Sequence, residues 1–434
     1  MSSGYWRLPI AFLLTMLFAS SAWAGAAWVY EMGTPEMGVA EAGRAAMATD
    51  ASTAFGNPAG MTRLEGSQFC GSLMGTVFTL TFDKGSDTQV PGGGKGSGDA
   101  GGLLPGGGIF YTTGLSPNWR FGVTLGSYVG GAINYADDWY GRYFVQSSSL
   151  LTFALNPVLA YRVTNWLSLG AGATVMYGML QQKTAINNAL DNTFGTGNFG
   201  DGQIKIEDTQ WNVGGNAGVL VEPLEGTRLG VTYRSSIELP FEDVPELKDV
   251  GPLLSTLLGA AGLNNKKMDL SVTIPQEVLF SFYQELFAKK LAIMGSVGWQ
   301  DWSEFGEATV AVSAEKLGKS FALQTKFQDT WHYAIGAQYR IGQPWLLSLG
   351  FAYDTSPFSK TKYRPLALPL DRQYRYSAGL QYDWSQAVTV GIAYTFLDAG
   401  EAPVDRSFPG LGTVQGHYSS NYANFVALNL NYKF

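Results

Sequence analysis

The last residues of the chain alternate between apolar and polar side chains. One face of this segment carries Val426, Leu428, Leu430, Tyr432 and Phe434, and the other carries Ala427, Asn429, Asn431 and Lys433. An apolar-out, polar-in strand that closes on a terminal aromatic residue is typical of the last strand of an outer-membrane β-barrel. A barrel in lipid is usually a pore or a surface enzyme, so this strand restricts both the fold and the range of functions.

The same two-residue period recurs along most of the chain. It appears in segments 121–128, 167–175, 211–219, 331–340, 373–382 and 388–395. One face of each segment is apolar with aromatic ends and the other is small or polar, as in a wall with lipid outside and a lumen inside. Short turns and long loops alternate between the segments. The pattern predicts an all-β fold: a transmembrane antiparallel β-barrel of about 14 strands, an even number as bacterial barrels require.

The N-terminus predicts export. Arg7 precedes an apolar stretch at residues 8–19, and a small-x-small cleavage site follows at residues 22–24. These features predict a secretory signal peptide at residues 1–24, removed after Sec-type export. Beyond it, no uninterrupted apolar run reaches spanning length. Residues 25 to about 64 do not alternate and are rich in Ala, Gly and Met, which predicts a compact N-terminal insert rather than a strand.

Composition narrows the possible functions. Charged residues make up 15% of the chain, against a usual share of about 25%, and the net charge of −7 argues against nucleic acid as a partner. The single cysteine, Cys70, excludes an intrachain disulfide, and two histidines cannot form a multi-histidine metal site, so we expect neither a metal nor a cofactor. A secreted, glycine-rich β-sandwich is the alternative fold, but its strands would need more uniform burial than the polar face allows.

Inward-facing basic residues form the first candidate site. Strand parity points Arg234 and Arg375 into the outer half of the lumen, together with His332. A guanidinium in a narrow apolar lumen could pair bidentately with a ligand carboxylate. The alternative is pairing with internal acids such as Asp354 or Asp383. His332 could also be the base of an outer-membrane hydrolase. No serine or carboxylate can be placed beside it from the sequence, which favours a structural or ligand-contact role.

Glycines cluster in the third predicted strand, at Gly126, Gly130 and Gly131. Glycine inside a strand marks a bulge, a kink or the close approach of another backbone. A kink here would break the pairing of the wall and open a gap toward lipid. Packing room for the N-terminal insert is an equally good interpretation of the same residues.

The long loop at residues 239–269 has a helical repeat. Apolar residues recur at intervals of three and four, which predicts an amphipathic helix. They are Leu247, Val250, Leu254, Leu257, Leu258 and Ala261. An outer loop with an apolar helix face either packs on the mouth of the barrel or offers an apolar landing surface, and the sequence favours neither.

Several segments together resemble the FadL-type family of outer-membrane transporters for long-chain fatty acids and other hydrophobic compounds. Residues 50–60 resemble the family's hatch motif, whose hallmark Asn-Pro-Ala stands here as Asn57-Pro58-Ala59, followed by Gly60. Further similar segments lie at residues 139–143, 156–162, 167–172, 299–303, 354–357 and 368–372. The resemblance covers essentially the whole mature chain.

The resemblance implies a monomeric barrel at residues 66–434, plugged by an N-terminal hatch at residues 25–65. Ligand would be captured on an apolar groove between the loops at 185–207 and 239–269. The capture residues implied are Leu247, Val250, Leu254, Leu257 and Leu258. The ligand would then pass to a lumen pocket near the start of the hatch. The pocket residues implied are Trp28, Val29, Tyr30, Arg234, Arg375 and His332.

Movement of the hatch, together with the kink at Gly126, Gly130 and Gly131, would let the ligand leave sideways into the membrane. The function implied is passive outer-membrane transport of long-chain fatty acids or similar hydrophobic molecules. Uptake of aromatic hydrocarbons such as toluene or xylene is the alternative, and an outer-membrane hydrolase is a remote one. The implied partners are the hydrophobic ligand, outer-membrane lipid with lipopolysaccharide, and the barrel assembly machinery, which would read Phe434.

Overall fold

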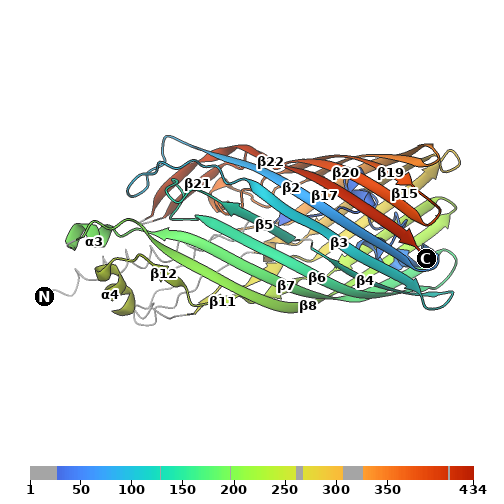
Figure 1. Cartoon of the computed structure of the whole chain (residues 1–434), viewed down its shortest axis with the longest axis horizontal. Coiled ribbons are helices and arrows are strands. Elements are labelled where there is room, and N and C mark those ends of the chain that lie inside the picture. The colour runs from blue at the N-terminus through green and yellow to red at the C-terminus, as the bar shows by residue number, and fades with distance from the viewer. Residues whose placement is uncertain (1–26, 128, 196, 261–266, 306–325, 409–410) are drawn as a thin grey trace.

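The wall of the molecule is a ring of antiparallel strands (Figure 1). The computed structural model describes residues 27–434 except 128, 196, 261–266, 306–325 and 409–410, so the predicted signal peptide at 1–24 lies outside the described residues. Fourteen strands form the ring when β4 and β5 count as one interrupted strand. They are β2 (Gln68–Lys84), β3 (Gly102–Gly114), β4 (Trp119–Gly126) with β5 (Val129–Asn134), β6 (Ser147–Arg162), β7 (Leu167–Ile186), β8 (Gly202–Leu224), β9 (Thr227–Arg234), β15 (Glu277–Leu286), β16 (Leu291–Gln300), β17 (Thr330–Gly342), β18 (Trp345–Asp354), β19 (Gln373–Asp383), β20 (Val388–Asp398) and β22 (Gly412–Lys433).

Pairing of the first wall strand with the last closes the ring. β2 pairs with β22 from Gln68 opposite Lys433 to Lys84 opposite Gly416. The side chains of this last strand alternate as the sequence predicts. Leu428 is 57% exposed on the outer face, whereas the neighbouring Ala427 is buried in the lumen. The predicted fourteen-stranded barrel, with an apolar outer face, is therefore confirmed.

The two ends of the barrel differ (Figure 1). One end carries the long loops, with helices α3 (Ala189–Phe194) and α4 (Pro252–Ala260) beyond the strands, and the C-terminus lies at the opposite end. The connections at the loop end also contain short strands. They are β10 (Ile237–Leu239), β11 (Glu242–Asp243), β12 (Glu246–Lys248), β13 (Met268–Asp269), β14 (Val272–Ile274) and β21 (Val404–Phe408). Short 3-10 turns occur at η3 (Trp302–Glu304) and η4 (Thr361–Tyr363). Across the described residues, no helix is long and apolar enough to cross a membrane.

The helix predicted across 247–261 is shorter than the sequence indicated. Leu247 lies in β12, opposite Ile204 of β8, and Val250 precedes the helix, so the prediction was wrong for these two residues. The positive φ of 53° at Asp249 interrupts a helical path, and Pro252 starts α4 because its fixed φ suits a first helical turn. Ala261 lies outside the described residues.

The lumen contains the N-terminal segment, which we call the hatch. It comprises β1 (Ala27–Trp28), η1 (Pro35–Val39), α2 (Thr53–Gly56) and η2 (Pro58–Arg63). Residues 30–62 are buried apart from Thr49. The sequence predicted no strand in this segment, and the two-residue β1 is the exception; it forms because Ala27 and Trp28 pair with the wall strand β5.

Wall glycines allow the hatch backbone to lie directly on the barrel. A Cβ atom added at Gly230 would fall 1.9 Å from the carbonyl oxygen of Ala45, and one added at Gly350 would fall 2.0 Å from the carbonyl carbon of Val39. No side chain fits at these distances, so glycine is required where hatch and wall backbones meet.

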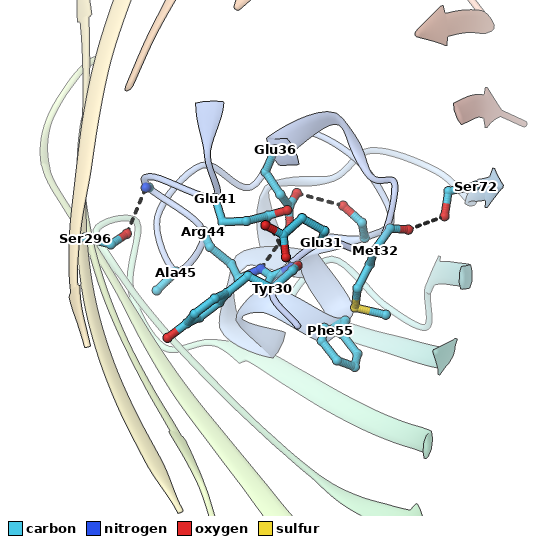
Figure 2. A network of polar contacts seen from close by, with 12 residues as sticks. Tyr30, Glu31, Met32, Glu36, Glu41, Arg44, Ala45, Phe55, Ser72 and Ser296 are labelled. Atoms are coloured by element: carbon cyan, nitrogen blue, oxygen red, sulfur yellow. Dashed lines mark hydrogen bonds and ion pairs between the residues drawn. The ribbon is translucent and has the colours of Figure 1, made fainter. Parts of the chain in front are cut away.

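A buried ionic network holds the hatch in shape (Figure 2). The Arg44 guanidinium lies 3.2 Å from Glu36 and 3.1 Å from Glu41, and it donates a 2.7 Å hydrogen bond to the carbonyl oxygen of Tyr30. Burial raises the pKa of the Glu41 carboxyl well above its usual range, and the nearby Arg44 only partly opposes this shift. The wall adds anchors: the Ser296 hydroxyl accepts a 2.9 Å hydrogen bond from the Gly43 amide.

This close packing predicts that Gly350→Val displaces the hatch near Val39. Overpacking of this kind costs about 1–3 kcal/mol, and here the clash falls on hatch backbone that a side-chain rotation cannot relieve. We expect the barrel to fold with its β-sheet circular dichroism unchanged and hatch peptides to be cleaved faster in limited proteolysis. The control is Gly75→Val, because a Cβ at Gly75 meets no atom within 4 Å. Equal cleavage of the two variants would contradict the prediction.

Candidate functional site

An apolar cavity of about 90 Å³ lies inside the barrel, beside the start of the hatch. Its apolar lining includes Trp28, Val29, Phe78, Ile133, Leu368 and Leu397. Polar groups gather around Glu31, Gln373, Arg375 and Asn421. An apolar chamber with a few convergent polar groups is the usual form of a small-molecule site.

The cavity adjoins a break in the barrel wall. β4 ends at Gly126, and the chain resumes as β5, which pairs with β6 and with hatch strand β1. β3 pairs with β4 only over its residues 109–114, so in the pairings of the described residues its residues 102–108 bond to β2 alone. Gly130 and Gly131 of β5 line the cavity together with Ala100, just before β3. The cavity therefore reaches the wall on both sides of the break.

Two of the three glycines of this strand, Gly126 and Gly130, have different surroundings. A Cβ at Gly126 would fall 2.0 Å from the methyl carbon of Met32 in the hatch, so this glycine gives packing room to the insert. A Cβ at Gly130 would meet its neighbours at 3.5 Å or more, which is ordinary contact. The strand break follows Gly126 directly. Gly126 thus gives room to the hatch and ends the paired strand, while a kink that opens the wall toward lipid stays a prediction.

Arg375 is the basic group at the cavity, and it is paired within the protein. Its Nε donates a 2.8 Å hydrogen bond to Glu31 of the hatch, its Nη1 pairs with Asp354, and its Nη2 donates to Gln373 at 2.9 Å. The side chains of Arg375 and Glu31 are each 2% exposed. The alternative of an internal acid as partner is therefore realised at this arginine, with Asp354 as expected and with Glu31 in addition.

His332 and Tyr30 extend this network away from the cavity. The His332 ring is stacked on Tyr30, with centroids 4.2 Å apart, and its Nδ1 lies 2.8 Å from Asp354. The Tyr30 hydroxyl accepts a 2.7 Å hydrogen bond from Gln300. Neither Tyr30 nor His332 lines the apolar cavity, although Tyr30 lines a smaller one, of about 20 Å³, that shares Trp28 and Arg375 with it.

Arg234 lies apart from the cavity and holds the hatch. It lies 3.3 Å from Glu277, donates a 2.5 Å hydrogen bond to the carbonyl oxygen of Phe55, and stacks 4.4 Å above the ring of Phe55. The structure therefore brings Trp28, Val29 and Arg375 together at one cavity, whereas Arg234 contacts the hatch at a different place.

The Asn-Pro-Ala segment fixes the end of the hatch to the wall. The Asn57 side chain donates to the carbonyl oxygens of Ala45, at 2.6 Å, and Val219, at 3.0 Å, and its oxygen accepts from the Ala59 amide. Pro58 opens η2, where a missing N–H costs nothing. Gly60 lies close to Ala48, within the hatch. These residues thus act as a cross-link between two parts of the hatch and β8.

Helices α3 and α4 form the outermost apolar cluster. Leu254 and Leu258 are buried, while Leu257 is half-buried and Phe194 is 75% exposed. The predicted apolar helix face therefore packs on the mouth of the barrel. Asp191 of α3 joins the two helices, because its carboxylate accepts hydrogen bonds from the α4 amides of Leu253 and Leu254, at 2.7 and 3.0 Å.

Sequence reasoning missed two acids that organise these sites, Glu31 and Asp191. Glu31 directly follows the predicted pocket residues in an otherwise apolar stretch, and that isolated charge was a usable signal. Asp191 stands in a polar loop without periodicity, where no pattern marks its helix-capping role.

Comparison with known sequences gives a consistent assignment. A family model described as "Outer membrane protein transport protein (OMPP1/FadL/TodX)" matches residues 15–434. Outer membrane protein P1 of Haemophilus influenzae is 26% identical over 430 residues, which cover 90% of this chain and 91% of that protein. A long-chain fatty acid transport protein of Escherichia coli is 26% identical over 309 residues, or 67% of this chain and 68% of that protein.

Solved structures share the fold. A Pseudomonas aeruginosa FadL homologue matches with a TM-score of 0.81 at 21% identity, covering 92% of this chain and 98% of that one. The Pseudomonas putida toluene transporter TodX matches with a TM-score of 0.61 at 15% identity, covering 91% and 97%. The closed antiparallel β-barrel fold is common to this chain and these structures.

The Asp191 contacts predict that Asp191→Ala loosens α4. Loss of a side-chain cap costs about 0.5–2 kcal/mol of local stability. The opening equilibrium of the Leu253 and Leu254 amides should rise by the factor equivalent to that free energy, and their hydrogen exchange should speed up by the same factor. Hydrogen exchange with mass spectrometry would measure it in the detergent-solubilised barrel. Asp191→Asn is the matched control, since it keeps one oxygen acceptor and should exchange at an intermediate rate. Unchanged exchange in both variants would show that Asp191 does not hold the two loops together.

Proposed function

This chain belongs to the OMPP1/FadL/TodX family of outer-membrane transport proteins, and from that premise we propose that it carries long-chain fatty acids passively into the outer membrane. Outer-membrane location and transport of hydrophobic compounds follow from the family. The ligand class and the route are our proposal. The observation that carries it is the apolar cavity between the hatch and the interrupted wall strand.

The proposed route begins at the loop end and leaves through the wall. Ligand lands on the apolar cluster of α3 and α4, where Phe194 and Leu257 remain accessible. It moves to the cavity beside Trp28 and Val29 and exits between β3 and β5, where pairing is interrupted. Each methylene group that leaves water contributes about 0.8 kcal/mol, so apolar sites of rising affinity draw the chain inward without an energy source. Lateral exit spares the ligand a passage through the aqueous periplasm.

The size of the cavity supports a moving hatch. An apolar cavity of about 150 Å³ is known to hold benzene, and the 90 Å³ found here is too small for a long acyl chain. Trp28 and Val29 form part of the lining, so a shift of the first hatch residues would enlarge the chamber. We therefore propose that residues 25–65 act as the movable hatch of a barrel formed by 66–434.

The choice of fatty acids over aromatic hydrocarbons is also a proposal. It is supported by the likeness to the long-chain fatty acid transport protein of Escherichia coli across two thirds of both chains. A guanidinium at the cavity, Arg375, supports it further, because a carboxylate-bearing ligand has a partner there. Aromatic hydrocarbons remain the second candidate, because the solved toluene transporter shares the fold.

We further propose that the protein acts as a transporter and not as an enzyme, as a monomer surrounded by outer-membrane lipid and lipopolysaccharide. The recorded polar partner of the His332 ring among the described residues is Asp354, a strand neighbour that also pairs with Arg375, which suits a structural role. Phe434 is 68% exposed at the end of β22, where the barrel assembly machinery can reach it.

Uptake in cells that lack their own hydrophobic channels tests the function. We expect cells that express this chain to take up labelled oleate, and cells that express a variant without residues 57–59 to lose that uptake, because Asn57 fixes the hatch to β8. Labelled toluene is the comparison. Uptake of toluene alone would overturn the fatty-acid proposal and favour the hydrocarbon candidate, and uptake of neither would reject both.

A disulfide between β1 and β5 tests the exit route. Ala27 and Gly130 are register partners, and antiparallel partners have Cα atoms about 4.5–5.5 Å apart, a separation that a disulfide spans. Oxidised Ala27→Cys/Gly130→Cys should lose most oleate uptake, and reduction should restore it. Each single variant is a control, and the native Cys70 is buried. Full uptake in the oxidised double variant would show that ligand leaves without movement of β1.

A further inference from the structure

We propose that Glu31 of the hatch occupies the place of a ligand carboxylate on Arg375, so that a fatty acid is admitted by exchange of one carboxylate for another. This inference rests on the proposed function and assigns a selectivity role to an acid that the family match does not identify. Its basis is the contact between Glu31 and Arg375 at the rim of the apolar cavity, which both residues line.

The formal charges around Arg375 leave no room for an additional anion. One guanidinium already contacts two carboxylates, Glu31 and Asp354, in a site where its side chain is 2% exposed. The hatch carries further buried acids, Glu36 and Glu41, which share Arg44. A third carboxylate on Arg375 would be desolvated beside like charges, which is strongly unfavourable. A carboxylate ligand therefore binds there when Glu31 leaves, and the formal charge of the site stays the same.

Glu31 is held in a way that permits exchange. One of its oxygens accepts the 2.8 Å hydrogen bond from Arg375 Nε, but the other, Oε2, is buried without a recorded partner. An unsatisfied buried oxygen carries a desolvation cost that the bound state does not recover. Asp354, by contrast, contacts both Arg375 and His332. Replacing Glu31 on Arg375 therefore breaks fewer contacts than replacing Asp354 would.

Departure of Glu31 would act on the exit. It stands three residues after Trp28, whose backbone pairs with Val129 of β5 at the break in the wall. Figure 2 shows Glu31 beside Arg44 and Glu41 in the middle of the buried ionic network. Movement of Glu31 therefore shifts the short segment that pairs with β5, whereas Asn57 keeps the far end of the hatch on β8. A neutral ligand does not compete with Glu31, so the contact between Glu31 and Arg375 stays in place when such a ligand enters the cavity.

The test compares oleate with oleyl alcohol, a neutral ligand of equal chain length, on the purified full chain. In Glu31→Gln the affinity for oleate should rise about tenfold, the effect of removing one like charge, while the affinity for oleyl alcohol should stay within about twofold of wild type. Glu41→Gln is the matched control, because Glu41 pairs with Arg44 and not with Arg375; it should leave the ratio of the two affinities unchanged. An unchanged ratio in Glu31→Gln would overturn the proposal.

A measurement on the wild-type protein avoids any folding defect of the variant. Both ligands need room beside Trp28 and Val29, but only oleate competes with Glu31, so saturating oleate should speed hydrogen exchange at residues 31–32 and saturating oleyl alcohol should not. Equal exchange with both ligands would overturn the proposal even if oleate binds and is transported. Failure of the wild type to bind either ligand would instead reject the proposed function. The two failures are thus distinguished by the wild-type binding data alone.

Discussion

Backbone groups at membrane depth must find partners within the protein, and this requirement organises the whole molecule. The ring from β2 to β22 meets it by closing on itself. The exception lies where β4 gives way to β5, beyond Gly126. There β5 pairs with the hatch, because Ala27 and Trp28 are the partners of Gly130 and Val129. The start of the hatch is thus part of the wall's pairing as well as part of the plug.

That dual role explains why the cavity, the ion pair and the wall break lie together. Glu31 follows the paired Trp28 by three positions, so the contact with Arg375 positions the segment that supplements the wall. Deeper in the lumen the hatch is fixed by other means: backbone packed against Gly230 and Gly350, and Asn57 bonded to β8. The hatch therefore has a body packed on the wall and a short first segment whose contacts with β5, Gln300 and Arg375 must be exchanged when it moves.

The sequence predicted the barrel well because lipid imposes a strict two-residue period on every wall strand. The same parity correctly turned Arg234 and Arg375 inward. Strand parity could not predict the partners of these arginines. Glu31 lies in a hatch without periodicity, where the contacts depend on the tertiary structure. The helix predicted from Leu247 failed at its start for a related reason: β12 takes its hydrogen bonds from β8, and only the folded chain shows that the two segments meet.

Selectivity in such a device depends on the charge of the ligand more than on its length. An apolar chamber rewards every methylene group alike, so it distinguishes oleate poorly from a hydrocarbon of similar size. A buried guanidinium that was free would bind any anion, and it would also carry an uncompensated charge in the resting protein. Pairing Arg375 with Asp354 and Glu31 avoids that cost, and the contact with Glu31 makes entry of a carboxylate conditional on release of the hatch segment. The acid that takes the place of the ligand carboxylate in the absence of ligand is thereby the group that links occupancy to the opening of the wall.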